Sequence, residues 1–253
     1  MYKVIDTHTH LEQLKDVETA IIEAKAAGVN AIIAVGEDYE SDQKVLALSQ
    51  TYPGFIYAAL GLHPWFIQAS ELDRTLAFIE AHIGEAIAVG EVGLDYDKRV
   101  RAKAEKDLQI QALRAVLKIA RTYRKPVSMH TRYAWRDSLD LVNEAQLEKV
   151  VFHWYTGTSS VLRDIVNLGY LISATPAVEY HEEHRRAVKE APLEKLLLET
   201  DCPVIYRRGT EFEYEARPIH VFKSLKGATE LKGVSEAHIA EVTTDNAVKF
   251  FGL

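Results

Sequence analysis

Histidine and carboxylate side chains stand at the ends of several short apolar runs in this sequence. Residues 4–10 read Val-Ile-Asp-Thr-His-Thr-His, so His8 and His10 close a run of apolar and β-branched residues. In an extended strand, residues two apart point to the same side, which would project both imidazoles together. Imidazole is a common ligand of divalent transition metals. The pair by itself predicts metal binding and no particular reaction.

Four later apolar runs also end in a residue that can bind a metal. These residues are Glu91 after Ala-Ile-Ala-Val-Gly, His130 after Pro-Val-Ser-Met, His153 after Lys-Val-Val-Phe, and Asp201 after Leu-Leu-Leu-Glu-Thr. Together with the first pair they could hold two divalent ions. The mixture of nitrogen and carboxylate ligands suits zinc or manganese better than calcium, which prefers oxygen ligands alone. A structural role explains any one of these histidines, but not all of them at predicted strand ends.

The elements that must position these side chains alternate between strands and helices. Eight apolar runs predict strands over residues 4–8, 31–35, 56–60, 86–91, 126–130, 150–153, 170–174 and 196–200. Apolar residues spaced three and four apart predict helices, for example over 17–27, 105–123 and 135–145, with two terminal helices near 219–231 and 235–250. Eight such units predict an α/β fold, a (β/α)8 TIM barrel, with residues 1–253 forming one domain. The metal site is then expected at the C-terminal mouth of the strands.

Composition and charge restrict the class of protein. Hydrophobic residues make up 47% and charged residues 26%, as in ordinary globular proteins. The sequence has neither a signal peptide nor a run of about 20 apolar residues, so we expect no membrane association. The single cysteine, Cys202, cannot form an internal disulfide, which favours a reducing, cytoplasmic location. A net charge of −7 is unlike that of a nucleic-acid coat protein but is compatible with an enzyme that holds one phosphate chain.

Six motifs occur in order along nearly the whole chain. They are IDTHTHL (5–11), GLHPW (61–65), GEVGLDY (90–96), HTR (130–132), FHWYTG (152–157) and ETDCP (199–203). This ordered set resembles the TatD family of metal-dependent hydrolases, within the wider amidohydrolase barrel group. The resemblance implies hydrolysis of phosphodiesters, with trimming of DNA from an end as the leading hypothesis. No obligate protein partner is evident.

The family resemblance also implies how the ligands are shared between two metal ions. One ion would be surrounded by His8, His10, Glu91 and Asp201, and Glu91 would bridge to a second ion held by His130 and His153. Zinc is the first expectation for both ions, and manganese, magnesium and cobalt are the alternatives.

The predicted reaction uses a water molecule acidified by a bound metal ion. Asp201 is expected to act as proton shuttle as well as ligand, and Glu91 is the second catalytic residue. Arg132 is the expected cation for the phosphoryl oxygens, because its planar guanidinium matches phosphate geometry. His63 would donate a hydrogen bond to the same group. The alternatives are an ion pair between Arg132 and an acid such as Asp137, and a loop-capping role for His63.

Several other side chains lie in predicted mouth loops. Trp65, Trp154 and Tyr155 could stack on nucleobases, with loop packing as the alternative. Arg207 and Arg208 could meet a substrate backbone or simply be solvated.

Some polar residues are expected to have other roles. Asp95, four residues after Glu91, is expected to orient a ligand or a loop. The segment from His181 to His184 is not a His-Glu-x-x-His motif, because its histidines are three apart, and it is expected on an exposed helix. Structural or solvated roles are expected for His82, His220 and His238.

Two features of the predicted mouth leave the substrate open. In HTRYAW (130–135) a bulky Tyr133 occupies a variable position of the His-x-Arg-x-Ala pattern, and residues 204–217 lack the Asn-Glu-Pro element that family members more often carry. The alternatives are a barrel hydrolase acting on a lactone, an amide or a small phosphoester, and a non-catalytic metal-binding scaffold. Barrels of the first kind often bridge their metals with a carboxylated lysine, whereas Glu91 takes that place here. The presence of all six ligands argues against the scaffold.

Overall fold

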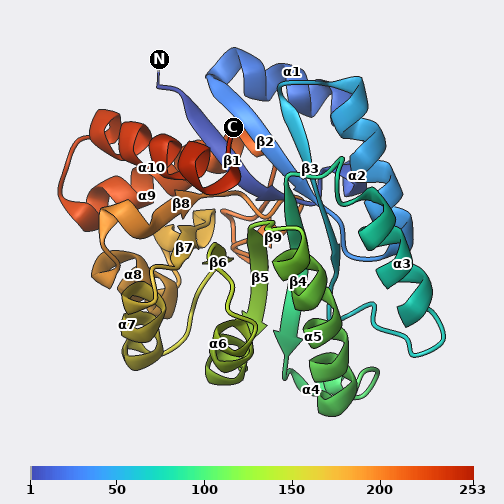
Figure 1. The fold of residues 1–253 in the computed structure, drawn as a ribbon. Helices are drawn as coiled ribbons and strands as arrows, with labels where there is room; N and C mark the ends of the chain where they lie inside the picture. Colours follow the sequence, from blue (N-terminus) through green and yellow to red (C-terminus); the bar gives the residue numbers. More distant parts are fainter. Residues whose placement is uncertain (1) are drawn as a thin grey trace.

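Eight parallel strands lie side by side in sequence order in the computed structural model, which describes residues 2–253 (Figure 1). They are β1 (Val4–Thr9), β2 (Val29–Val35), β3 (Ile56–Leu62), β4 (Ala88–Asp95), β5 (Val127–Arg132), β6 (Val150–Phe152), β7 (Leu171–Ala174) and β8 (Leu196–Leu198). The chain after β8 returns to β1, where the backbone N–H of Asp201 donates to the carbonyl of His8 (3.0 Å). The sheet is therefore a nearly closed barrel, and the predicted (β/α)8 fold is confirmed.

Helices cover the outside of the strands (Figure 1). They are α1 (Val17–Ala27), α2 (Tyr39–Thr51), α3 (Leu72–His82), α4 (Lys98–Arg101), α5 (Lys106–Thr122), α6 (Trp135–Glu144), α7 (Ser159–Asn167), α8 (Glu182–Glu190), α9 (Val221–Lys232) and α10 (Glu236–Phe251). Among residues 2–253, no helix has the length and apolar character needed to cross a bilayer.

Periodic burial explains why these segments form strands and helices. Every residue of β1 is buried, because one face of a barrel strand points into the barrel and the other lies under the helices. In α5 the apolar side chains of Ala112, Leu113, Val116 and Ala120 recur at helical spacing and are buried. Fully burying a side chain the size of valine or leucine contributes about 1.5–3 kcal/mol. The helices are thereby fixed against the strands that carry the polar ends.

Most predicted elements are present with small shifts at their ends. The strands β6 and β8 end at Phe152 and Leu198, so His153 and Asp201 follow the strands and do not belong to them. The loop predicted over residues 204–217 contains a short antiparallel pair, β9 (Ile205–Tyr206) and β10 (Tyr214–Glu215). Strands of two residues have too little periodicity to be recognised in a sequence.

The segment from His181 to His184 was expected to be exposed, and this is wrong for His184. Its side chain is completely buried at the start of α8. The Nε2 atom accepts a hydrogen bond from the backbone N–H of Thr175 (3.1 Å), and Nδ1 donates to the carbonyl of Tyr155 (3.0 Å). His184 thus joins two loops at the barrel mouth as a neutral imidazole.

Candidate metal centre

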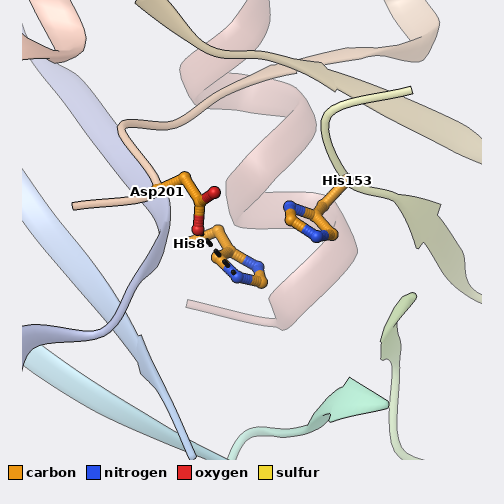
Figure 2. Close-up of side chains that lie close together, drawn as sticks. All are labelled: His8, His153 and Asp201. Carbon is orange, nitrogen blue, oxygen red and sulfur yellow. Dashed lines mark ion pairs between the residues drawn. The ribbon is translucent and has the colours of Figure 1, made fainter. Parts of the chain in front are cut away.

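The structure brings all six predicted metal ligands together at the C-terminal ends of the strands. Figure 2 shows three of them, His8, His153 and Asp201, lying close together although they come from distant parts of the chain. Five of the six residues are buried and His130 is half-buried. A polar cluster withdrawn from water in this way needs partners for its charges.

Glu91 lies at the centre of the cluster. Its Oε2 atom is 3.3 Å from Nε2 of His8 and 3.3 Å from Nε2 of His10. Its Oε1 atom is 2.8 Å from Nδ1 of His130 and 2.8 Å from Nε2 of His153. The two carboxylate oxygens therefore face two different pairs of histidines. Although burial favours the neutral acid, the surrounding histidines hold the pKa of Glu91 well below its usual value.

Asp201 completes the first group of ligands. Its Oδ1 atom is 3.3 Å from Nε2 of His10 and 3.6 Å from Nε2 of His8. The backbone of Asp201 has a φ of 50°, in the left-handed region that aspartate tolerates better than most residues. Burial opposes its ionisation, but hydrogen bonding with His10 and the nearby charges of His153 and His8 lower the pKa of this carboxyl.

The donor atoms fit divalent metal ions. The Nε2 atom of His8 is buried without a hydrogen-bond partner, although buried polar atoms are normally paired. Ligand atoms of His8, His10 and Glu91 lie within 4.8 Å of one another, as do those of His63, Glu91 and His130. A mixture of imidazole and carboxylate donors is typical of zinc and manganese sites.

The second ring nitrogen of each histidine in the cluster also has a polar neighbour. Nδ1 of His8 is 3.0 Å from the hydroxyl of Ser128, and Nε2 of His130 is 3.1 Å from Oδ2 of Asp95. Nδ1 of His153 faces Glu199 at 3.5 Å and Nδ1 of His10 faces Glu37 at 3.7 Å, in both cases without a hydrogen bond. Hydrogen-bonded partners, as at His8 and His130, fix the ring orientation and the tautomer of a metal-binding histidine.

His63 lies against Glu91 and can serve as a hydrogen-bond donor. Its Nε2 atom is 3.4 Å from Oε1 of Glu91, and its Nδ1 atom accepts from the backbone N–H of Trp65 (3.1 Å). Burial lowers the pKa of His63 to about 4, so the ring is neutral near pH 7. Because Nδ1 is an acceptor, the single proton sits on Nε2, which faces the cluster. The loop-capping contact is therefore present at Nδ1, while donation from Nε2 to a phosphoryl group stays a prediction.

Arg132 is held by Asp95 and not by Asp137. Its Nη2 and Nε atoms are 2.7 Å from Oδ2 and 3.0 Å from Oδ1 of Asp95. Asp137 instead accepts from the hydroxyl of Tyr96 (2.8 Å) and pairs with Lys106 (2.7 Å). The alternative for Arg132, an ion pair with a nearby acid, is therefore present, but the acid is Asp95 in place of Asp137. Its side chain keeps 31% of its surface exposed, so the guanidinium can still meet a ligand at the mouth.

The comparisons with known proteins agree with this geometry. The family model "TatD related DNase" matches residues 5–252. The chain belongs to the TatD family. The deoxyribonuclease TATDN3 of Homo sapiens is 33% identical to it over 261 residues, which cover 98% of this chain and 94% of that protein. The uncharacterized metal-dependent hydrolase YabD of Bacillus subtilis (strain 168) is 33% identical over 262 residues, covering 98% of both chains. The crystal structure of YJJV, a TatD homolog from Escherichia coli k12, superposes with a TM-score of 0.88 at 29% identity and covers 99% of this chain and 98% of its own.

The aromatic residues of the mouth differ in how much of their surface a TatD substrate could reach. Trp65 is 46% exposed, and Trp154 is half-buried with its ring 5.6 Å from that of Tyr206. Tyr155 is completely buried, and its hydroxyl donates to the carbonyl of Thr158 (2.9 Å). A ring without exposed surface cannot stack on a base, so the prediction for Tyr155 is wrong. The alternative, loop packing, describes it.

Two acidic residues of the TatD centre escaped the sequence analysis. Glu37 follows β2 and is nine-tenths buried, with its Oε2 atom 3.7 Å from Nδ1 of His10. It stands at a polar strand end, so the rule that identified Glu91 would also have found it. Glu199 precedes Asp201 by two residues and accepts from the backbone N–H of Trp154 (3.0 Å). Residues two apart in an extended chain share a side, which was the available signal.

Proposed function

We propose that this TatD protein is a two-metal-dependent phosphodiesterase that acts on nucleic acid, with DNA as the first candidate. The observation that carries this proposal is the position of Glu91. Its two oxygens face two separate pairs of histidines, at 3.3 Å on one side and 2.8 Å on the other. A carboxylate that reaches two ligand sets is suited to bridge two ions.

These contacts support one assignment of the ligands to the two ions. One ion would be held by His8, His10, Glu91 and Asp201, and the second by Glu91, His130 and His153. Zinc suits this donor set, and manganese, magnesium and cobalt are alternatives. When bound, such ions supply a Lewis acid for the phosphoryl oxygen and lower the pKa of a coordinated water.

Asp201 and Glu91 are proposed as the catalytic residues, with Asp201 moving the proton. The lowered pKa of Asp201 leaves its carboxylate ionised near neutral pH, so it can accept a proton from an attacking water. The same carboxyl can then deliver that proton to the leaving oxygen. Its position beside Nε2 of His10, at 3.3 Å, keeps it directed into the mouth.

Arg132 and His63 are proposed to bind the phosphoryl group. The guanidinium of Arg132 is fixed by Asp95 at 2.7 Å and stays partly exposed, and its charge complements a phosphate. Nε2 of His63 carries the ring proton and can donate it in a hydrogen bond. Both groups stabilise negative charge on oxygen without reorganising. Trp154 is proposed to stack on a nucleobase, for which its partly exposed ring leaves room.

The choice of DNA as substrate is supported by the name of the human relative, which is a deoxyribonuclease. Tyr133, which is 62% exposed, and the β9–β10 hairpin modify the mouth where a substrate would bind. These features keep hydrolysis of a small phosphoester, a lactone or an amide as the second candidate. A cytoplasmic location stays a prediction from the single cysteine.

The test is a substrate panel with metal-loaded protein. Single-stranded and duplex DNA, RNA and small esters are incubated with the wild type and Asp201→Asn, each loaded with zinc, manganese, magnesium or cobalt. We expect metal-dependent cleavage of DNA, lowered at least 100-fold in Asp201→Asn because general acid–base catalysis contributes about 10²–10⁴-fold. Asp164→Asn is the control for a lost charge, since Asp164 is a half-exposed aspartate on α7 that pairs with Arg136. Cleavage of the small esters alone would refute a nuclease function.

A further inference from the structure

A strongly basic segment lies beside the metal centre. Residues 97–106, which we name the basic loop, include α4 and the turn that follows it. Within residues 98–106 the only carboxylate is Glu105, against five exposed cationic side chains, those of Lys98, Arg99, Arg101, Lys103 and Lys106. The whole chain carries a net charge of −7, so this concentration of positive charge is local.

The basic loop begins at a residue that contacts Asp95, which in turn lies against the proposed metal ligand His130. The backbone N–H of Asp97 donates to Oδ1 of Asp95 (2.9 Å), and Oδ2 of Asp95 is 3.1 Å from Nε2 of His130. Figure 1 shows α4 just beyond the arrowhead of β4, on the same side of the barrel as the carboxyl end of that strand. A chain bound at the metals could therefore pass over the loop.

A buried glutamine holds the basic loop in place. The side chain of Gln109 is completely buried in α5. It accepts from the backbone N–H of Asp95 (2.8 Å) and donates to the carbonyls of Asp95 (3.0 Å) and Ala104 (2.8 Å). The residue two positions before the loop and Ala104 near its end are thus tied to one side chain. A surface fixed in this way loses little conformational entropy when it binds a ligand.

Three of the five cations are available for a ligand. Arg99 pairs with Asp97 (3.0 Å) and Lys106 pairs with Asp137 (2.7 Å). Among the described residues 2–253, no ion pair joins Lys98, Arg101 or Lys103 to a carboxylate. An open hollow of about 480 Å³ is lined by Lys98 and Arg101, with Ala102, Glu105, Lys106 and Asp107 around it.

We propose that the basic loop binds the phosphate backbone of a nucleic-acid substrate next to the phosphodiester that is cleaved. The inference rests on the proposed function and adds to it a second contact surface, outside the metal centre. Isolated surface lysines are usually only solvated, but here the cations are clustered on a loop whose backbone Gln109 holds at Ala104. This loop follows Asp95, a contact of His130. Backbone phosphates would release counterions on binding, which makes the contact salt-dependent and independent of base sequence.

The test compares the triple variant K98A/R101A/K103A with the wild type. Alanine favours helix, so α4 should still form. The control is K118A/K189A/K226A, which removes the same charge from exposed sites on α5, α8 and α9. Binding of a phosphorothioate-linked single-stranded 20-mer to metal-loaded protein is followed by fluorescence anisotropy against salt concentration. In parallel, kcat/KM is measured for an unmodified 20-mer and for bis(4-nitrophenyl) phosphate, which has no phosphate besides the one that is cleaved and so offers the basic loop no backbone phosphate.

Three lost phosphate contacts should lower the slope of log K against log salt by about 2, at about 0.7 per contact on a single strand. If the wild type and the variant bind equally at 1 M salt, this difference in slope makes the variant bind about 100-fold more weakly at 0.1 M salt. We expect kcat/KM for the 20-mer to fall in K98A/R101A/K103A and that for the small diester to stay unchanged. If the variant binds and cleaves the 20-mer as the control does, the inference is wrong. If the wild type cleaves neither substrate, the proposed function fails, and the salt dependence of binding still decides the role of the loop.

Discussion

Replacing Asp95 by asparagine tests whether this residue positions both His130 and Arg132. Although burial opposes ionisation, hydrogen bonds from His130 and Arg132 hold the pKa of Asp95 far below its usual value, so it is a carboxylate that accepts at both oxygens. Oδ1 accepts from the N–H of Asp97 (2.9 Å) and Nε of Arg132 (3.0 Å). Oδ2 faces Nε1 of Trp65 (2.7 Å), Nε2 of His130 (3.1 Å) and Nη2 of Arg132 (2.7 Å).

The size of the effect of Asp95→Asn follows from these five contacts. An asparagine amide can replace only one oxygen as an acceptor, and its NH₂ group leaves at least two of these donors without a partner. Each buried donor left without a partner costs about 1–3 kcal/mol of stability. Changes to residues that support a metal ligand typically lower metal affinity or activity about 10- to 100-fold. We therefore expect Asp95→Asn to weaken binding of the ion held by His130 by that factor and to lower kcat/KM similarly.

The assay for Asp95→Asn is competition with a metal chelator, together with kcat/KM on a 20-mer. Asp137→Asn serves as the control, because Asp137 is a nearby aspartate bonded to Tyr96 and Lys106 and not to the metal ligands. Metal affinity and kcat/KM within two-fold of the wild type in Asp95→Asn would refute the positioning role.

Three further changes test other parts of the structure. Burial lowers the pKa of His184 from 6.5 to about 4, so on acidification this histidine is protonated in the unfolded chain before it is protonated in the folded protein. The free energy of unfolding should therefore fall by about 3 kcal/mol between pH 6.5 and 4. In urea unfolding across this range, the free energy of unfolding should fall less in His184→Gln, and an equal fall would contradict a buried, neutral His184. A Cβ at Gly93 would clash with the carbonyl oxygen of His130, so Gly93→Ala should lower the melting temperature and metal affinity together. An unchanged metal affinity would show that His130 is not displaced. Tyr155→Phe should cost about 1 kcal/mol of stability, because it loses the hydrogen bond to Thr158, and leave kcat/KM unchanged. A large fall in kcat/KM would restore a substrate role for Tyr155.

The barrel and its ligands could be predicted because both depend on local signals. Each parallel strand is a short apolar run, and a polar residue at its end interrupts the pattern. Parallel strands carry these ends to one mouth, so His8, Glu91 and His130 could be placed together without knowing the helix packing. The resemblance carried by the order of motifs then supplied the division of ligands between two ions, which stays a prediction.

The direction of a side chain after a strand ends could not be predicted. Trp154 follows His153 with a φ of 39°, a left-handed turn of the backbone, and Tyr155 is turned into the core. His184 is buried because loops from two other strands close over it, which involves residues distant in sequence. Glu37 was missed for a different reason, since β2 was predicted from its apolar residues and the polar residue after it was not considered.

The metal content of the purified protein tests the central claim most directly. Elemental analysis of the wild type and of Glu91→Ala, both loaded with zinc or manganese and then desalted, should give about two ions per chain in the wild type and fewer than one in the variant. This result is expected because Glu91 faces both histidine pairs, at 3.3 Å and 2.8 Å. A full load of two ions in Glu91→Ala would contradict the bridging role, and a metal-free wild type after loading would contradict the metal centre itself.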